Sequence, residues 1–213
     1  RADINDALFW YQSAADQGLI KAQYALGQIF EMGDGVPINH REAARWYRQA
    51  ALQGDASAQY KLGEWLLFGG TNLGTDRTQG LDWLNQSAAL GHAGAQYTLG
   101  DIHFNGWSGS PINTKLGIAW YEKAANQGYA KAQTTYAYTF MDMSNDYDRA
   151  AEWHLKAAEQ GESESQFALA GLYQSGLGVK QSDAKAIEWY RKAAEQGHVE
   201  AQRDLEDLLK GSR

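Results

Sequence analysis

The sequence predicts an all-α protein built from stacked pairs of helices, and three observations lead to this fold class. A glutamine recurs at spacings of 36, 37, 37, 33 and 36 residues, as Gln23, Gln59, Gln96, Gln133, Gln166 and Gln202. A glycine that closes the pattern "AAxxG" recurs in the same steps. Only 2 of the 213 residues are proline, which suits helices because proline interrupts their hydrogen bonds. Two markers in one register indicate a structural repeat of solenoid length.

Each repeat begins with a segment that we call helix A. In the copy from Lys21 to Gly33, the apolar residues Ala22, Leu26 and Ile29 recur at helical spacing and predict one buried face. The expected ends of the five complete copies are Gly33, Gly69, Gly106, Met143 and Gly176. Glycine suits such an end because it adopts the left-handed backbone that terminates a helix.

The second segment of each repeat, helix B, ends in a Trp-Tyr-x-x-Ala-Ala pattern or a variant of it. A residue with a good N-capping side chain stands seven positions before each tryptophan, at Asn39, Asp76, Asn113, Asp146 and Ser182. Glu42 and Gln79 stand three residues after their caps and predict a reciprocal capping box.

These segments predict a single solenoid domain over residues 1–213, with about 12 helices. We expect a leading helix B at 3–18, five A–B repeats, and a terminal helix A at 198–213. The repeats are expected at 19–54, 55–91, 92–128, 129–161 and 162–197.

One tryptophan recurs in each helix B, as Trp10, Trp46, Trp83, Trp120, Trp153 and Trp189. A large aromatic residue that returns once per repeat is expected to fill the seam between helix pairs, so we predict that all of this column is buried. Gly27, Gly63 and Gly100 lie inside helix A, where glycine is unfavourable, and indicate close helix packing.

The pattern "AQYALGQIFEMGDGV…AARWYRQAALQG" resembles the Sel-1-like repeat, a relative of the tetratricopeptide repeat, over nearly the whole chain. The fifth repeat matches best, and the fourth departs most, with Thr134, Tyr136 and Met143 at pattern positions. The resemblance implies a right-handed superhelical α-solenoid whose A helices line a concave groove. It also implies a non-catalytic scaffold that holds a protein or peptide partner.

Composition excludes several other functions. A net charge of −7 argues against a nucleic-acid face. No apolar run is long enough for direct membrane insertion. The sequence has no cysteine, no histidine pair at metal-ligand spacing on one helix face, and no carboxylate paired with a nucleophile or a phosphate loop. We therefore expect no catalytic, cofactor-binding or metal site.

The expected partner-binding residues lie mainly in the columns of helix A that vary between repeats. These columns stand two residues before and two, five and nine residues after the repeated glutamine, which places them on one stripe of the helix. Aromatic residues outside the repeat columns add to the stripe as hot-spot candidates. The predicted site consists of Lys61, Glu64, Trp65, Phe68, Asp101, Trp107, Tyr138 and Asp142.

Family resemblance alone points to an adaptor, a bacterial regulator or a toxin-neutralising immunity protein, in the periplasm or otherwise outside the cytoplasm. The alternative from another class is a peptidoglycan-directed hydrolase or a glycan-binding protein of the cell envelope. We also expect that the leading helix B leaves an apolar edge at Leu8, Phe9 and Tyr11, because its own helix A is missing from the sequence. Self-association through that edge follows from this expectation.

Overall fold

The computed structural model describes residues 4–69 and 74–211, and within these ranges it contains twelve α-helices, one short 3-10 helix and no strand. The chain divides into two compact units, residues 1–112 and 113–213. Unit 1 contains α1 Ile4–Asp16, α2 Ile20–Met32, α3 His40–Leu52, α4 Ala56–Phe68, α5 Arg77–Ala89, α6 Ala93–Asn105 and the 3-10 helix η1 Trp107–Gly109. Unit 2 contains α7 Thr114–Asn126, α8 Ala130–Ser144, α9 Tyr147–Glu159, α10 Ser163–Ser175, α11 Asp183–Glu195 and α12 Val199–Gly211.

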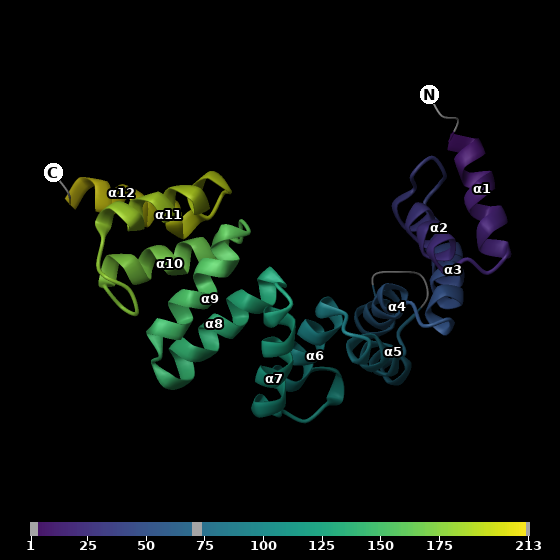
Figure 1. The fold of residues 1–213 in the computed structure, drawn as a ribbon, viewed down its shortest axis with the longest axis horizontal. Helices are drawn as coiled ribbons and strands as arrows, with labels where there is room; N and C mark the ends of the chain where they lie inside the picture. The colour runs from purple at the N-terminus through teal and green to yellow at the C-terminus, as the bar shows by residue number, and fades with distance from the viewer. Residues whose placement is uncertain (1–3, 70–73, 212–213) are drawn as a thin grey trace. The chain divides into compact units, whose positions relative to one another are not determined.

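Within each unit, helices that are consecutive in the sequence pack side by side (Figure 1). The even-numbered helices are the predicted A helices and the odd-numbered helices are the B helices. The expected first helix, 3–18, begins outside the described residues, and the expected last helix, 198–213, ends outside them. Residues 70–73 of the second A–B loop also lie outside the described ranges.

The predicted helix boundaries are largely confirmed. All five expected N-cap side chains accept a hydrogen bond from the backbone N–H three residues later. The reciprocal half of the capping box is wrong: the N–H of Asn39 donates to the carbonyl of Phe30 at 2.8 Å, and that of Asp76 donates to Leu66 at 3.0 Å. These bonds fasten the start of helix B to the end of the preceding helix A.

The fourth repeat ends its A helix differently from the sequence expectation. Helix α8 runs past Met143 to Ser144, and Asn145 takes the left-handed conformation at φ 52° that glycine takes elsewhere. Asparagine tolerates this backbone better than other non-glycine residues do. The shorter loop of this repeat is therefore balanced by a longer helix.

The repeated glutamine links successive helices through its side-chain amide, which is buried in every copy except Gln202. Each side chain donates from Nε2 to a carbonyl near the end of the preceding B helix at 3.1 or 3.2 Å, as in Gln23 to Ala15. The amide oxygen of Gln23 accepts in turn from Gln53, which follows the next B helix, at 2.7 Å. The same second bond joins Gln160 to Gln133 and Gln196 to Gln166. We call this arrangement the glutamine relay.

The internal glycines of helix A allow close packing, as the sequence predicts. A Cβ atom on Gly27 would lie 2.4 Å from the ring of Tyr47, and one on Gly63 would lie 2.7 Å from Leu84. Tyr47 and Leu84 occupy the column directly after the repeated tryptophan, and they are fully buried, as are Tyr121, His154 and Tyr190 in the same column.

The prediction that the whole tryptophan column is buried is wrong. Trp46 is 1% exposed because it packs with Ala15 of α1 and with Ala22 and Leu26 of α2, whereas Trp10 on α1 is 68% exposed. In unit 2, Trp120, Trp153 and Trp189 are only half-buried. Each carries a lysine ammonium over its ring, from Lys123, Lys156 and Lys192, at 4.0, 3.8 and 3.9 Å from the centroid.

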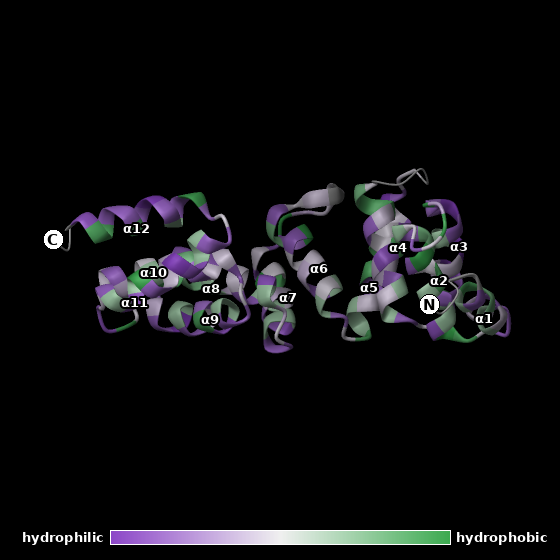
Figure 2. Ribbon diagram, turned by 90° about the horizontal axis from the view of Figure 1, so that it is seen from above, coloured by the Kyte–Doolittle hydropathy of each residue, from purple (hydrophilic) through white to green (hydrophobic). Residues whose placement is uncertain are grey.

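Helix α12 presents a hydrophilic outer side, and most of it has hydrophilic colouring in Figure 2. At the repeat positions where α10 packs Phe167 and Ala170 against α11, α12 carries Arg203 and Glu206. The polar side of α12 therefore does not offer a further B helix an apolar surface.

Substitution of the repeated tryptophan is expected to have very different effects at two repeat-equivalent positions. Trp46→Ala should lower the free energy of unfolding by about 3–5 kcal/mol, the usual cost of deleting a buried aromatic side chain. Trp10→Ala should lower it by less than about 1 kcal/mol because the ring is exposed. Urea unfolding of both variants measures the difference, and equal losses would contradict the observed burial.

The relay has one gap that a single substitution should fill. Leu90 stands where other repeats have the second glutamine, and Oε1 of Gln59 is buried without a partner among the described residues. The backbone of Leu90 matches that of Gln53, so Leu90→Gln should supply the missing donor and raise stability by about 1 kcal/mol.

Leu90→Glu is the matched control for this substitution, because a carboxylate has similar size but cannot donate a hydrogen bond at neutral pH. Urea midpoints should rise for Leu90→Gln alone. If the glutamate variant gained as much stability, the effect would come from removal of an exposed leucine and not from the relay.

Candidate functional site

The A-helix surface of unit 1 is joined by an ion pair between neighbouring A helices. Lys61 Nζ on α4 lies 2.9 Å from Glu31 Oε1 on α2, and both side chains are largely shielded from solvent. The hydroxyl of Tyr47 donates to the other oxygen of Glu31 at 2.5 Å. Lys61 is therefore a fixed charge with a partner, and it holds α2 and α4 together.

Two large apolar side chains are exposed at the ends of the two helices that this ion pair joins. Met32 and Phe68 occupy the last position of α2 and of α4 and are 64% and 51% exposed. Both belong to the variable column nine residues after the repeated glutamine. Glu64, one turn before Phe68, accepts a hydrogen bond from Tyr60 at 2.5 Å. The arrangement places exposed apolar groups beside charges that are already oriented.

The remaining predicted residues of unit 1 have different environments. Trp65 is half-buried, with its ring 5.5 Å from that of Tyr47 and 5.9 Å from that of His40. Trp107 lies in η1 and is 49% exposed. Asp101 is half-buried on α6. Trp65 thus belongs to the packing of unit 1, whereas Phe68 and Trp107 offer apolar surface to solvent.

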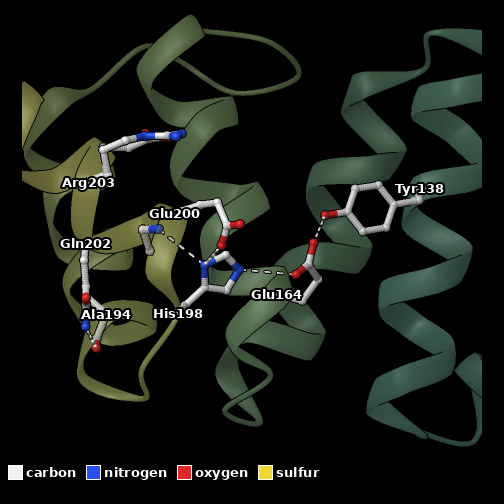
Figure 3. Close-up of polar contacts among 9 residues, drawn as sticks. Tyr138, Glu164, Ala194, His198, Glu200, Gln202 and Arg203 are labelled. Atoms are coloured by element: carbon white, nitrogen blue, oxygen red, sulfur yellow. Dashed lines mark hydrogen bonds and ion pairs between the residues drawn. The ribbon is translucent and has the colours of Figure 1, made fainter.

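The A-helix surface of unit 2 carries a chain of polar contacts across three A helices (Figure 3). The Tyr138 hydroxyl on α8 donates to Glu164 Oε1 on α10 at 2.6 Å. The second oxygen of Glu164 lies 3.2 Å from Nε2 of His198, which precedes α12. Nδ1 of His198 accepts from the N–H of Ala201 at 3.3 Å, so Nε2 bears the hydrogen that is donated to Glu164.

Tyr138 is more strongly bound within the fold than a free anchor residue would be. Its ring lies edge to face with that of His154 at 4.8 Å. Burial and the hydrogen bond to Glu164 raise the pKa of its hydroxyl well above the ordinary value. Asp142, one turn further along α8, is exposed. Substitution of Tyr138 is therefore expected to disturb the packing of unit 2 as well as any contact between Tyr138 and a binding partner.

Beneath this surface lies a buried pair of residue types that hydrolases use, Ser165 and His154. The Thr134 hydroxyl donates to the Ala130 carbonyl at 3.1 Å, so it accepts from Ser165 at 2.8 Å. Ser165 in turn accepts from Nδ1 of His154 at 3.0 Å. In this chain the histidine donates to the serine, whereas activation of a nucleophile requires it to accept a proton.

Both side chains are also fully buried, so no substrate reaches them. Burial lowers the pKa of His154 to about 4, and the nearby Glu164 carboxylate opposes this shift only in part. The group is a neutral, structural histidine.

His92 and His198 have a role that the sequence analysis did not identify. Nδ1 of His92 accepts from the N–H of Ala95 at 3.2 Å and so caps α6, as His198 caps α12. Each imidazole ring stacks on an aromatic ring at 4.6 Å, that of Tyr60 or of Phe167. The sequence signal for this capping role is their shared repeat position, directly after the glycine that follows helix B.

Two further features of the described residues concern metal binding and membrane insertion. These residues contain no group of three or more His, Cys, Asp or Glu side chains arranged to hold a metal ion. None of the helices in the part of the chain that the structure describes is long and apolar enough to cross a membrane.

Comparison with known proteins identifies the family of the repeat. The model of the Sel1 repeat matches residues 1–19, 20–55, 56–92, 93–129, 140–162 and 163–198. The chain belongs to the Sel1 repeat family. The unmatched residues 130–139 fall in the A helix of the fourth repeat, which contains Thr134 and Tyr136. No curated protein matches the sequence.

Solved structures with the same fold include two at more than 30% identity. A protective antigen with an SLR fold, present in uropathogenic Escherichia coli strains, is 33% identical with a TM-score of 0.86, and the match covers 94% of this chain and 43% of that protein. A Sel1 repeat protein from Oxalobacter formigenes is 31% identical with a TM-score of 0.90, covering 97% and 60% of the two chains. The chain therefore spans less than two thirds of the length of either relative.

An immunity protein from Pseudomonas aeruginosa shares the fold at lower similarity, with 21% identity, a TM-score of 0.60 and coverage of 88% and 72%. The similarity extends to the arrangement of the helices and no further.

The pH dependence of stability tests the buried state of His154. An unfolded histidine titrates near pH 6.5, so between pH 6.5 and 4 the unfolded chain binds a proton that the native chain does not. Stability should therefore fall as the pH falls through this window, by roughly 2 kcal/mol between pH 7.5 and 5.

His154→Leu should lack this part of the pH dependence, because leucine occupies the same repeat position at Leu84 and does not titrate. Urea unfolding of both proteins at each pH gives the comparison. Parallel stability curves for the parent and the variant would show that His154 takes up a proton as readily in the native protein as in the unfolded chain, which would contradict its lowered pKa.

Proposed function

We propose that this Sel1 repeat protein is a non-catalytic scaffold that binds a protein or peptide partner through its A-helix surfaces. The observation that carries the proposal is the exposure of Met32 and Phe68 at one variable repeat position on neighbouring A helices, which the Lys61–Glu31 pair joins. Exposed apolar groups next to oriented charges are typical of binding surfaces. Methionine also adapts its shape to a partner at little cost.

The proposed partner site in unit 1 consists of Phe68 and Trp107 as apolar contacts, with Lys61, Glu64 and Asp101 as polar contacts. In unit 2 we propose Tyr138 and Asp142. Trp65 acts mainly by supporting α4 from the inside, given its half-buried packing on Tyr47.

Within this proposal the protein acts as an adaptor, as a regulator or as a toxin-neutralising immunity protein. The likeness to an immunity protein supports the fold only, so identification of the bound protein distinguishes these classes. The hydrolase alternative gains no support from Ser165 and His154, because both are buried and hydrogen-bonded in the wrong direction for catalysis.

We also propose that α1 mediates self-association, because Phe9, Trp10 and Tyr11 are all exposed on it. Leu8 is half-buried and packs with the core around Leu26, so a substitution there would test folding. Trp10→Asp is the appropriate variant. Sedimentation at increasing concentration should show weaker association for Trp10→Asp than for the parent chain.

Binding by the A-helix surface is tested with the chain immobilised and its retained protein partner identified by mass spectrometry. The purified partner should then bind Phe68→Ala about 2 kcal/mol more weakly than the parent, in the range of a hot-spot truncation. Leu52→Ala is the matched control, since Leu52 is also an exposed apolar residue but lies at the end of a B helix.

Neither substitution should change the melting temperature noticeably, because both side chains are exposed. If Leu52→Ala weakened the complex while Phe68→Ala bound like the parent, the A-helix surface would not be the binding site.

A further inference from the structure

Helix α3 carries three arginines on one side, at repeat positions where no other B helix has three basic residues. Arg41, Arg45 and Arg48 follow each other at steps of four and three residues, so they lie along one face of the helix. At the position of Arg45, other B helices carry Asp82, Glu152 and Glu188. The repeat itself therefore does not require this basic row.

The three arginines line a cavity of about 520 Å³ in unit 1, between α3 and α5 with α4 beneath. The inner surface is apolar and includes two indole rings, and its members are Ala44, Leu62, Trp65, Leu66 and Trp83. Asp76 and Gln79 at the start of α5 complete the wall opposite the arginines. This cavity lies on a different side of α4 from Lys61, Glu64 and Phe68.

Two of the guanidinium groups are available to a ligand. Arg45 donates to Glu42 at 3.1 Å and lies over the ring of Trp46 at 4.4 Å, which orients it. Arg41 and Arg48 are exposed and form no ion pair with any residue that the structure describes. The Asp76 carboxylate is occupied by the N–H of Gln79 at the start of α5.

The chemistry of the cavity defines the ligand that fits it. Guanidinium groups bind carboxylates in a two-pronged geometry, and indole rings favour an apolar or aromatic side chain. Arg41 and Arg48 are about 10 Å apart along the helix axis, at 1.5 Å per residue. Two acidic residues three positions apart in a polyproline II segment, which has three residues per turn and rises about 3.1 Å per residue, lie on one side and span about the same distance.

We propose that this cavity binds an extended acidic segment of a partner protein, with two carboxylates on Arg41 and Arg48 and an apolar side chain between them on the indole floor. The net charge of −7 repels large polyanionic surfaces such as nucleic acids and anionic membranes. A short acidic segment meets three arginines against the single carboxylate of Asp76 in this cavity, so charge complementarity favours it. This surface is separate from the A-helix site, and either can fail without the other.

The test uses the peptide acetyl-Gly-Glu-Leu-Phe-Glu-Gly-amide and isothermal titration calorimetry on the full chain. The parent should bind this peptide at least tenfold more tightly than the same peptide with glutamine in place of both glutamates. The affinity should fall with added salt, as expected for contacts between charged groups.

Arg41→Glu and Arg48→Glu should each weaken binding at least tenfold. Arg191→Glu is the matched control, because Arg191 occupies the position of Arg48 on helix α11, which contributes no residue to the lining of the cavity. It should leave the affinity unchanged. Thermal melts of all variants confirm that each is folded.

Three results would overturn the proposal. The first is equal binding of the glutamate and glutamine peptides, and the second is an equal loss in Arg191→Glu and Arg48→Glu. The third is binding of phosphatidylglycerol vesicles by the parent that Arg48→Glu abolishes, which would assign the arginines to a lipid surface.

Discussion

The repeated glutamine of the A helices, buried in the five copies from Gln23 to Gln166, makes the hydrogen bonds on which the packing of the repeats depends. A side-chain amide has both a donor and an acceptor, so one residue can bond to the helix before it and to the helix after it. Gln133, for example, donates to the Ala125 carbonyl and accepts from Gln160. Because these groups are buried, an unmade bond costs more free energy than a made bond contributes. The relay therefore fixes the register of successive helices as well as stabilising them.

The residues that hold the repeats together are different from the residues that are available for function. The glutamine, the buried column after the tryptophan and the internal glycines keep the helices in place through contacts such as Gly27 against Tyr47. The positions outside this framework are free to vary, and they differ between surfaces. The A-helix surface of unit 1 combines exposed apolar groups with a fixed ion pair, whereas the cavity beside α3 combines arginines with an apolar floor. A repeat protein can thus carry two kinds of recognition on one framework.

The repeat register predicted the helices, their caps and their terminal glycines because these depend on residues close in sequence. Burial of the tryptophan column was not predictable in the same way, since it depends on how other helices pack over each ring, as the difference between Trp10 and Trp46 shows. The place of Tyr138 was also beyond the sequence pattern. Its column indicates an outward-facing side chain, but its bond to Glu164 needs the position of the next A helix. The arginine cavity depends on three helices and was not predicted.

A double-mutant cycle on Gln133 and Gln160 tests the glutamine relay most directly. The free energy of unfolding would be measured for the parent, Gln133→Leu, Gln160→Leu and the double variant. Leucine is a natural residue at the second position, as Leu90 shows. If the 2.7 Å bond between the two amides couples the helices, the losses should depart from additivity by about 1 kcal/mol. Additive losses, within about 0.3 kcal/mol, would show that the two glutamines act independently and would contradict the relay.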